Sequence, residues 1–183
     1  MPQAAASWTA AQVRLLPEDG NRYEVVDGEL LVTPAPVARH QRALRELLIP
    51  LNDYLRRTRL GEILWSPADI EFDSRTLVQP DLFVLPLVDG RELPNWGDIT
   101  TLLLAIEVLS PSTARYDRLT KRRLYQRQGV EYWIVDLDAR VIERWVPHED
   151  RPQILAERLE WSPPGANEPL VIDLERFFEK LWT

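Results

Sequence analysis

The most informative features of the sequence are the residues and patterns that it lacks. It contains no cysteine among its 183 residues, which excludes disulfide bonds, thiolate nucleophiles and cysteine-ligated zinc sites. It has no apolar run close to the roughly 18 residues that a bilayer-spanning helix needs. Residues 1–11 lack the basic start and apolar middle of a secretion signal. We therefore expect a cytoplasmic protein that makes no contact with a membrane.

The chain also lacks an excess of positive charge. Its 22 lysines and arginines are outnumbered by 29 aspartates and glutamates, so the formal net charge is −7, an unfavourable total for a protein that binds nucleic acid. The arginines are gathered, however, in residues 39–60 and 114–128, whose charges sum to +4 and +5. Two basic segments on an acidic body can present a local positive face that the net charge conceals.

Length and composition predict one globular domain. Apolar residues make up 45% of the chain and charged residues 28%, which is typical of folded proteins rather than disordered or fibrous ones. A chain of this length is the size of a single domain. We expect one domain over residues 1–183, with a lead-in over 1–20, a core over 21–146 and C-terminal strands and a helix over 147–183.

The spacing of apolar residues predicts strands and helices in mixed order about one central sheet, which is an α/β or α+β fold. Asp27-Gly28 between two short apolar strands indicates a hairpin over 22–32. Pro50 is expected to kink or divide a helix over 38–59. The other predicted elements are a short helix after Ser7 or Thr9, extended segments over 62–72 and 77–85, a buried strand over 101–109, a helix over 114–128, strands over 131–136, 141–146, 153–159 and 169–172, and a helix over 173–181.

Glu107 is the first candidate for a chemical role. It is the single charged residue in the apolar run over 101–109, which has the pattern of a central strand buried on both faces. Burying an ionised carboxylate without a partner costs several kcal/mol. Glu107 is therefore paired, protonated, bound to a metal or placed at the open end of the strand. A structural glutamate that reaches solvent or an arginine is an equally good reading of this residue alone.

Asp81 is the second candidate, because Pro80-Asp81 lies inside the extended segment over 77–85. Proline cannot donate to a strand ladder, so it marks an edge or a bulge where a side chain is redirected. Alone, Asp81 is better explained as the entry to a turn. Together with Glu107 on a neighbouring strand, it supplies the converging oxygens that a hard divalent cation such as Mg²⁺ binds.

Lys121 is the third candidate. The chain uses arginine almost throughout, and Lys121 and Lys180 are its two lysines. Lysine, unlike arginine, can have its proton affinity tuned by burial and by neighbouring charges. The simpler alternative is an exposed salt bridge between Asp117 and Lys121, four residues apart on one helix, which stabilises the helix by a few tenths of a kcal/mol.

Taken in order, these residues and the segments around them resemble the PD-(D/E)XK nuclease superfamily, in the variant whose lysine has moved from the strand to the following helix. More closely, the chain resembles the Uma family, a large group of bacterial domains classed with restriction endonucleases. Leu109 stands where the superfamily usually has its strand lysine, so the role of that lysine passes to Lys121. The resemblance runs from Tyr23 to about Trp145 and is carried by Tyr23–Leu30, Pro34–His40, Gln79–Leu82, Glu107–Thr113, Lys121 with Tyr125, and Gly129–Asp136.

The resemblance implies a restriction-endonuclease-like fold, in which helices flank a central mixed sheet that follows an N-terminal hairpin. It also implies metal-dependent endonuclease activity on nucleic acid, with DNA as the favoured substrate. Asp81, Glu107 and the backbone carbonyl of Val108 would hold Mg²⁺ or Mn²⁺. Lys121 would orient the attacking water or stabilise the charge that develops on the phosphate.

Further residues have supporting roles in this reading. Glu24 is the best additional acid, and His40 has either a structural role or a place in the site. The basic segments would grip the phosphate backbone without reading sequence, through Arg42, Arg45, Arg115, Arg118 and Arg122. Most of the seven tryptophans, among them Trp133, Trp145 and Trp161, are expected in the core or in a subunit contact rather than under a stacked base.

Two other classes of function stay open. A nucleic-acid-binding or assembly module on the same fold, with weak or absent catalysis, agrees with the net charge of −7. A structural subunit is the second, because exposed sheet edges and the apolar stretch Leu170–Trp182 favour self-association. For the nuclease as well as for the structural subunit, we expect a two-fold homodimer.

Overall fold

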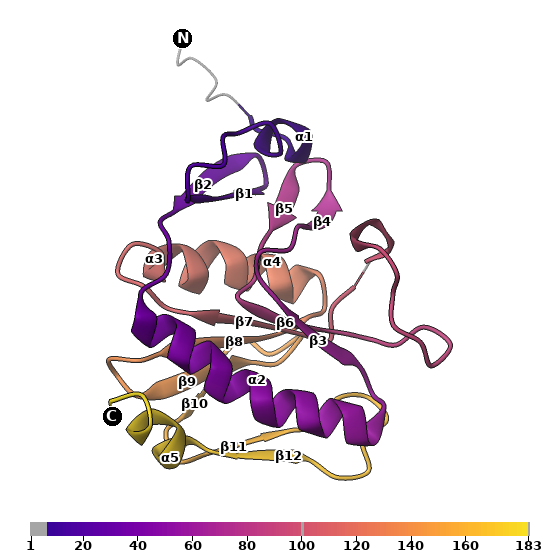
Figure 1. The fold of residues 1–183 in the computed structure, drawn as a ribbon, viewed down its shortest axis with the longest axis vertical. Helices are drawn as coiled ribbons and strands as arrows, with labels where there is room; N and C mark the ends of the chain where they lie inside the picture. Colours follow the sequence, from indigo (N-terminus) through magenta and orange to yellow (C-terminus); the bar gives the residue numbers. More distant parts are fainter. Residues whose placement is uncertain (1–6, 100, 183) are drawn as a thin grey trace.

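The strands of the computed structural model form three sheets, of which the largest has six strands (Figure 1). The structure describes residues 7–99 and 101–182, so residues 1–6 of the predicted lead-in and residues 100 and 183 lie outside it. The strand order of the largest sheet is β10–β9–β8–β7–β6–β3. Its neighbouring strands are antiparallel except β7 and β8, which are parallel, so the sheet is mixed. Its strands are β3 (Glu62–Trp65), β6 (Leu82–Leu85), β7 (Leu104–Val108), β8 (Glu131–Asp136), β9 (Val141–Trp145) and β10 (Gln153–Leu155).

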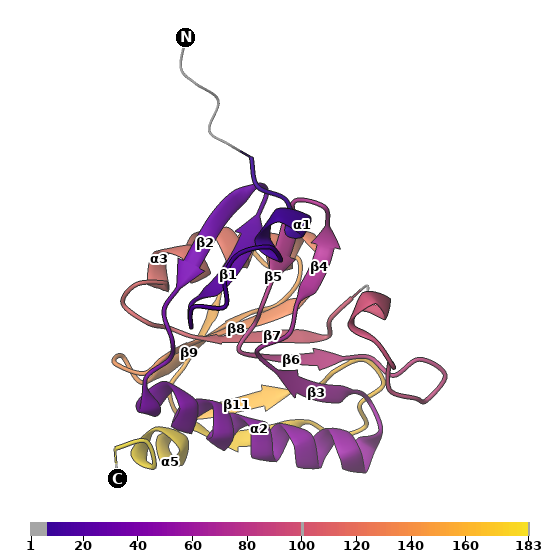
Figure 2. The same cartoon turned by 45° about the horizontal axis from the view of Figure 1, so that its top comes forward.

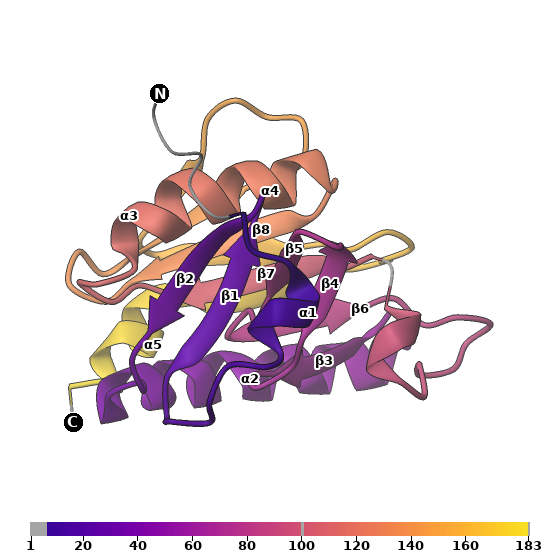
Figure 3. The same ribbon diagram turned by 90° about the horizontal axis from the view of Figure 1, so that it is seen from above.

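The second sheet has four strands in the order β2–β1–β5–β4 and contains the predicted hairpin. Val26 pairs with Glu29, so the turn is Asp27-Gly28, and both turn residues have the positive φ that a tight hairpin turn requires. A short helix, α1 (Ala10–Val13), starts at its capping residue Thr9 and packs on this sheet. The strands are β1 (Arg22–Val26), β2 (Glu29–Thr33), β4 (Ile70–Asp73) and β5 (Thr76–Val78), and they lie side by side in Figure 3.

Helices cover both faces of the six-stranded sheet. α2 (Ala38–Thr58) lies along one face, and the helical segment that connects β7 to β8 lies along the other (Figures 1 and 2). This segment consists of α3 (Ala114–Tyr116), the π-helical turn η2 (Asp117–Lys121) and α4 (Arg122–Arg127). Single π-turns inside helices are frequently found at functional sites, and this one carries Lys121.

Two apolar clusters hold these layers together. Leu47 and Leu51 of α2 pack with the six-stranded sheet and with the two-stranded sheet of β11 (Arg158–Trp161) and β12 (Leu170–Asp173), next to α5 (Leu174–Glu179). On the opposite face, Leu124 and Tyr125 of α4 pack between the two larger sheets. A short 3₁₀ helix, η1 (Trp96–Asp98), lies in the long connection between β6 and β7.

Three predicted strands were wrong as single elements, and the four-stranded and two-stranded sheets were not predicted beside the central mixed sheet. Residues 62–72 divide into β3 and β4, and residues 77–85 into β5 and β6, with the members of each pair in different sheets. Pro80 cannot donate to a ladder, and at Pro80-Asp81 the chain leaves the four-stranded sheet and enters the six-stranded one. Residues 153–159 likewise divide into β10 and β11.

The helix α2 is not divided at Pro50, one of the two outcomes predicted there, and continues as one element. Leu47, Leu51 and Tyr54 are buried around this point, and their packing on the sheet outweighs the hydrogen bond that proline cannot make. Across residues 7–99 and 101–182, no helix combines the length and the apolar character needed to cross a bilayer.

Candidate active site

A cluster of buried ionisable side chains lies where β6 begins and β7 ends. In the described part of the chain, all but one of the buried polar or charged residues belong to it, and the exception is Thr76. Asp81 immediately precedes β6 and Glu107 is the second-last residue of β7. The buried members of the cluster are Glu24, His40, Asp81, Glu107, Asp117 and Lys121, and the partly buried Arg22 joins them.

Lys121 is the centre of one half of the cluster. Its Nζ atom lies 2.7 Å from Glu107 Oε1 and 2.8 Å from Glu24 Oε2. Asp117 Oδ1 is more distant, at 3.8 Å. The amine of Lys121 is therefore shared between acids of β1 and β7. An exposed bridge within the helix, the simpler alternative, was wrong, since the Lys121 side chain is only 4% exposed.

Asp81 is the centre of the other half. Arg22 donates to its Oδ1 atom at 2.9 Å, and the backbone amide of Val108 donates to its Oδ2 atom at 2.9 Å. His40 Nε2 also lies 2.9 Å from Oδ2. Because an ionised carboxylate only accepts hydrogen bonds, this nitrogen carries the proton. The Val108 contact ties Asp81 directly to the end of β7, next to Glu107.

Burial and charge move the proton affinities of the cluster in different directions. Burial by itself would raise the pKa of Asp81, but its bonds to His40, Arg22 and the Val108 amide outweigh this and hold that pKa well below its usual range. Burial raises the pKa of Glu107 well above its usual value, against the opposing effect of Lys121. Burial likewise raises the pKa of Asp117 to about 6. Asp81 is thus the carboxylate that stays ionised most readily.

The charges of the cluster do not cancel. With a neutral His40, four carboxylates face Arg22 and Lys121, which leaves two negative charges when all four acids are ionised. The three acids nearest to Lys121 outweigh its desolvation and raise the pKa of the ammonium. Lys121 is therefore charged at neutral pH, and the three acids around it share its single ammonium group.

The cluster opens into a cavity of about 850 Å³. The lining of this active-site cavity includes Asp81, Glu107 and Lys121 together with the segments 110–114 and 136–139. A volume of this size is ordinary for a ligand site. The acids and the lysine are thus buried within the fold yet reachable from one cavity.

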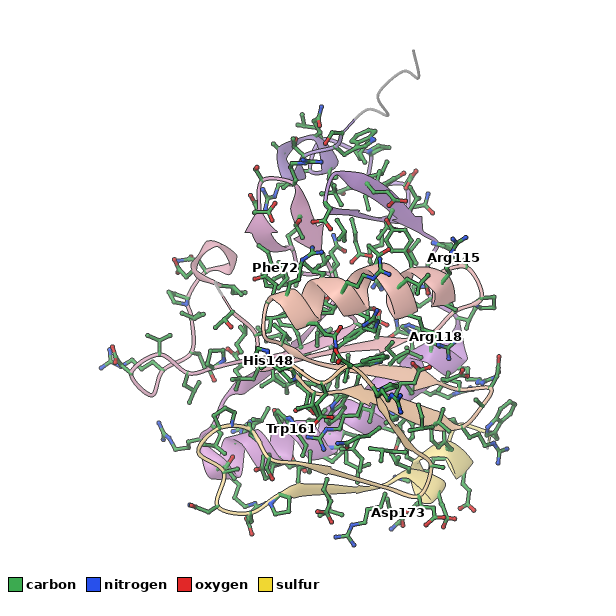
Figure 4. The ribbon with its side chains drawn as sticks, turned by 180° about the vertical axis from the view of Figure 1, so that it is seen from behind. Phe72, Arg115, Arg118, His148, Trp161 and Asp173 are labelled. Carbon is green, nitrogen blue, oxygen red and sulfur yellow. The ribbon has the colours of Figure 1, made fainter. Side chains whose placement is uncertain are left out.

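The five arginines predicted to bind nucleic acid differ in their surroundings. Arg118 pairs with Asp136 and Glu143, and Arg45 pairs with Glu46. Arg122 donates to Gln126 and lies over the ring of Trp145. Arg42 and Arg115 are exposed, and they form no ion pair with any residue that the structure describes. Figure 4 shows Arg115 and Arg118 on the helix that follows β7.

Sequence reasoning missed Arg22 as a member of the site. A signal was present, because Arg22 and Glu24 are two residues apart on a predicted strand, and such residues share one face. The partner of Arg22, Asp81, is 59 residues away in the sequence, so the pairing depends on the arrangement of the two sheets. Asp117 was considered only as a helix partner of Lys121.

Comparison with known proteins assigns the chain to a family. The sequence model of the Uma2 family, described as "Putative restriction endonuclease", matches residues 10–182. The chain belongs to the Uma2 family. This match confirms the resemblance found in the sequence and extends it past Trp145, through the C-terminal strands and helix.

The fold of this Uma2 protein also matches a solved structure. The crystal structure of a protein from Anabaena variabilis, titled a putative nuclease belonging to DUF820, superposes with a TM-score of 0.76, and the match covers 95% of this chain and 99% of that one. The sequence identity is 18%, so this likeness speaks for the fold, and it confirms the predicted restriction-endonuclease-like architecture. Comparison with functionally curated proteins finds no match.

Proposed function

We propose that this Uma2 protein is an endonuclease that hydrolyses phosphodiester bonds of DNA with a divalent cation, Mg²⁺ or Mn²⁺. The observation that carries the proposal is the position of Asp81, Glu107 and Lys121 in one buried cluster that lines a cavity. The family and the structural neighbour support nuclease activity as the general class.

The donor set suits a hard divalent cation, because it consists of carboxylate oxygens. Asp81, Glu107 and the carbonyl of Val108 would hold the ion. The N–H and C=O groups of one strand residue point to the same side of the strand. Because the Val108 N–H donates a hydrogen bond to Asp81, we infer that the Val108 carbonyl also points toward that aspartate. A cation held there supplies Lewis-acid activation of the scissile phosphate and of a water molecule.

As the cluster stands, Lys121 fills part of this space. Among residues 7–99 and 101–182, no three acidic or histidine side chains converge as ligands of a metal ion. Lys121 lies between Glu24 and Glu107, and three donors already engage Asp81. Use of Glu107 Oε1 as a ligand requires Lys121 to release it, and the bond of Lys121 to Glu24 can be kept.

This exchange gives Lys121 a role in the reaction. An ammonium has three N–H donors, and two of them now serve Glu107 and Glu24. After release of Glu107, the amine has donors available for the attacking water or for a phosphate oxygen. Glu24 keeps the amine in place, while Arg22 and His40 fix the orientation of Asp81.

A cleavage assay tests the proposal. Plasmid and single-stranded DNA are incubated with the protein in Mg²⁺ or Mn²⁺, and we expect cleavage that is lost in both Asp81→Asn and Lys121→Met. Lys180→Ala is the matched control, because Lys180 is the other lysine and its side chain is half exposed. Cleavage that survives in both site variants would remove these residues from the mechanism.

A binding module without useful turnover is the second candidate function. It is favoured by the contacts that already engage Asp81 and Glu107, because they occupy the oxygens that a metal ion would need. Titration calorimetry with Mg²⁺ separates the two candidates. The nuclease requires binding that Glu107→Gln weakens, whereas the module predicts salt-sensitive DNA binding with no such metal site.

We also propose a two-fold homodimer, the commonest symmetric assembly of soluble proteins. Exposed apolar side chains of the C-terminal half, Ile154 and Val171, support a contact there. Sedimentation at micromolar concentration tests this, and a monomer would contradict it.

A further inference from the structure

A second cavity lies beside the active-site cavity and shares part of its lining. Its volume is about 810 Å³. Both cavities are lined by Arg22, Asp81 and residues 34–36. Asp81, whose side chain is 2% exposed, thus belongs to the lining of both cavities. A molecule whose reacting group is at Asp81 in the first cavity can extend into the second one, which we call the Trp65 cavity.

Trp65 is the most distinctive residue of this second cavity. It is the last residue of β3 and pairs with Leu82. The next residue, Ser66, donates its backbone amide to the carbonyl of Asp81 at 3.2 Å. Trp65 is therefore the sequence neighbour of a residue that is hydrogen-bonded to Asp81, the proposed metal ligand.

The indole of Trp65 is exposed and lies unstacked among the residues that the structure describes. It is 55% exposed, nearly the same as Trp182 at 54%. The ring of Trp182, however, is covered by the guanidinium groups of Arg39, at 4.2 Å, and Arg140, at 5.5 Å. Among the described residues, neither an aromatic ring nor a guanidinium group lies on Trp65. A large ring left exposed at the edge of a cavity is available to a ligand.

The walls of the cavity agree with a flat ligand that is apolar on its faces and polar on its edges. Trp65 is on the same strand face as Ile63, which packs in the cluster of α2, so its indole is on the side of α2. Leu44 and Leu48 of α2 line the cavity there, next to the polar side chain of Gln41. Stacking on an aromatic ring with polar groups at the edges is how proteins hold unpaired nucleobases.

We propose that the Trp65 cavity binds a nucleobase of the substrate strand, next to the scissile phosphate, by stacking on Trp65. This inference depends on the proposed function and narrows its substrate class. Bases inside a duplex are stacked on both faces and cannot reach a side cavity unless they leave the helix. The substrate is therefore single-stranded or locally unpaired nucleic acid.

Binding to a fluorescently labelled single-stranded oligodeoxynucleotide, in the presence of EDTA, tests the stacking without cleavage. We expect Trp65→Ala to weaken binding about tenfold and Trp65→Phe, which keeps an aromatic face, to restore most of it. Trp182→Ala is the control, because its exposure is matched and it lines neither cavity. The matched duplex should bind less tightly than the single strand and show no effect of Trp65→Ala.

Cleavage of a series of oligonucleotides, each lacking one base at a different position, locates the subsite. An abasic residue is placed at successive positions of the oligonucleotide. At one position near the cut, we expect the wild-type cleavage rate to fall to the rate at which Trp65→Ala cleaves the intact oligonucleotide. At that position, Trp65→Ala should show no additional loss. Equal binding and cleavage by wild type and Trp65→Ala would overturn the base subsite and leave the nuclease intact. Binding that depends on Trp65, without any metal-dependent cleavage, would support the subsite and overturn the nuclease.

Discussion

The type of each residue in the buried cluster follows from the atoms that it meets. The compact ammonium of Lys121 directs separate N–H groups to Glu24 and Glu107, which a planar guanidinium cannot do in the same space. Arg22 instead meets one carboxylate, Asp81, and the carbonyl of Gln79. The single buried lysine in a chain rich in arginine is thus explained by two acids that converge on one point.

His40 is predicted to act through Asp81. Its Nε2 atom holds Oδ2 of that carboxylate, and its Nδ1 atom is buried without a partner among the described residues. Removal of such a supporting group typically lowers metal affinity or activity by about 10–100-fold. We expect His40→Ala to weaken Mn²⁺ binding and lower kcat within this range, with the KM for DNA nearly unchanged.

The other histidine provides the control for this prediction. His148 has a φ of 70° in an exposed loop, a conformation that asparagine tolerates well. His148→Asn should retain wild-type metal binding and kcat. An unchanged Mn²⁺ affinity in His40→Ala would show that His40 has only a packing role.

Asp117 makes the stability of the metal-free protein depend on pH. Burial raises its pKa from 3.8 to about 6 in the folded state, so between these values the folded chain holds a proton that the unfolded chain has released. Stability therefore falls as the pH rises through this window and does not recover above it. The opposite contribution of Asp81, whose folded pKa is lowered, is lost only at lower pH.

Urea unfolding in EDTA at pH 4.5 and pH 7 tests this effect. We expect the wild type to lose on the order of 2 kcal/mol over the interval, and Asp117→Asn to lose clearly less, because it has no proton to release there. A free energy of unfolding that rises with pH in the wild type would contradict the prediction.

The strands and helices show which parts of the fold the sequence determines locally. The hairpin turn at Asp27-Gly28 and the buried strand β7 were predictable, because a two-residue turn signal and an unbroken apolar run need no distant partner. The division of residues 77–85 was not, since it depends on which sheet each half joins. Glu107 and Lys121 could be recognised from their unusual surroundings in the sequence. The contact of Lys121 with Glu24 of the second sheet could not.

Gly61 is predicted to be required where α2 turns into β3. A Cβ atom at this position would lie 2.6 Å from the backbone carbonyl oxygen of Leu85 in β6, closer than any real contact, and a backbone atom in a sheet has little freedom to move. We expect Gly61→Ala to lower the free energy of unfolding by about 1–3 kcal/mol, measured by urea denaturation. Gly97→Ala, which meets no atom within 4 Å, should change it by less than about 0.5 kcal/mol. Equal stability of the two variants would refute the steric argument.

The candidate site is assembled from elements that are far apart in the sequence. β1 of the four-stranded sheet supplies Arg22 and Glu24, the six-stranded sheet supplies Glu107, and the helices on its two faces supply His40 and Lys121. A ligand that binds this cluster binds only the folded chain, because unfolding separates every member. Cation binding and global stability are therefore linked.

This linkage predicts stabilisation by a divalent cation at neutral pH. With all four acids ionised, the cluster has two negative charges in excess, and a cation that neutralises them at about 100 times its Kd stabilises the fold by about 2.7 kcal/mol. For a chain of this length we expect the Tm to rise by about 5–10 °C in Mn²⁺. At pH 5 the rise should be smaller, since burial raises the pKa of both Glu107 and Asp117 and protons therefore compete more strongly with the cation. Glu107→Gln should lose most of the rise and Lys180→Ala should keep it, whereas an equal rise in both variants would place the cation elsewhere.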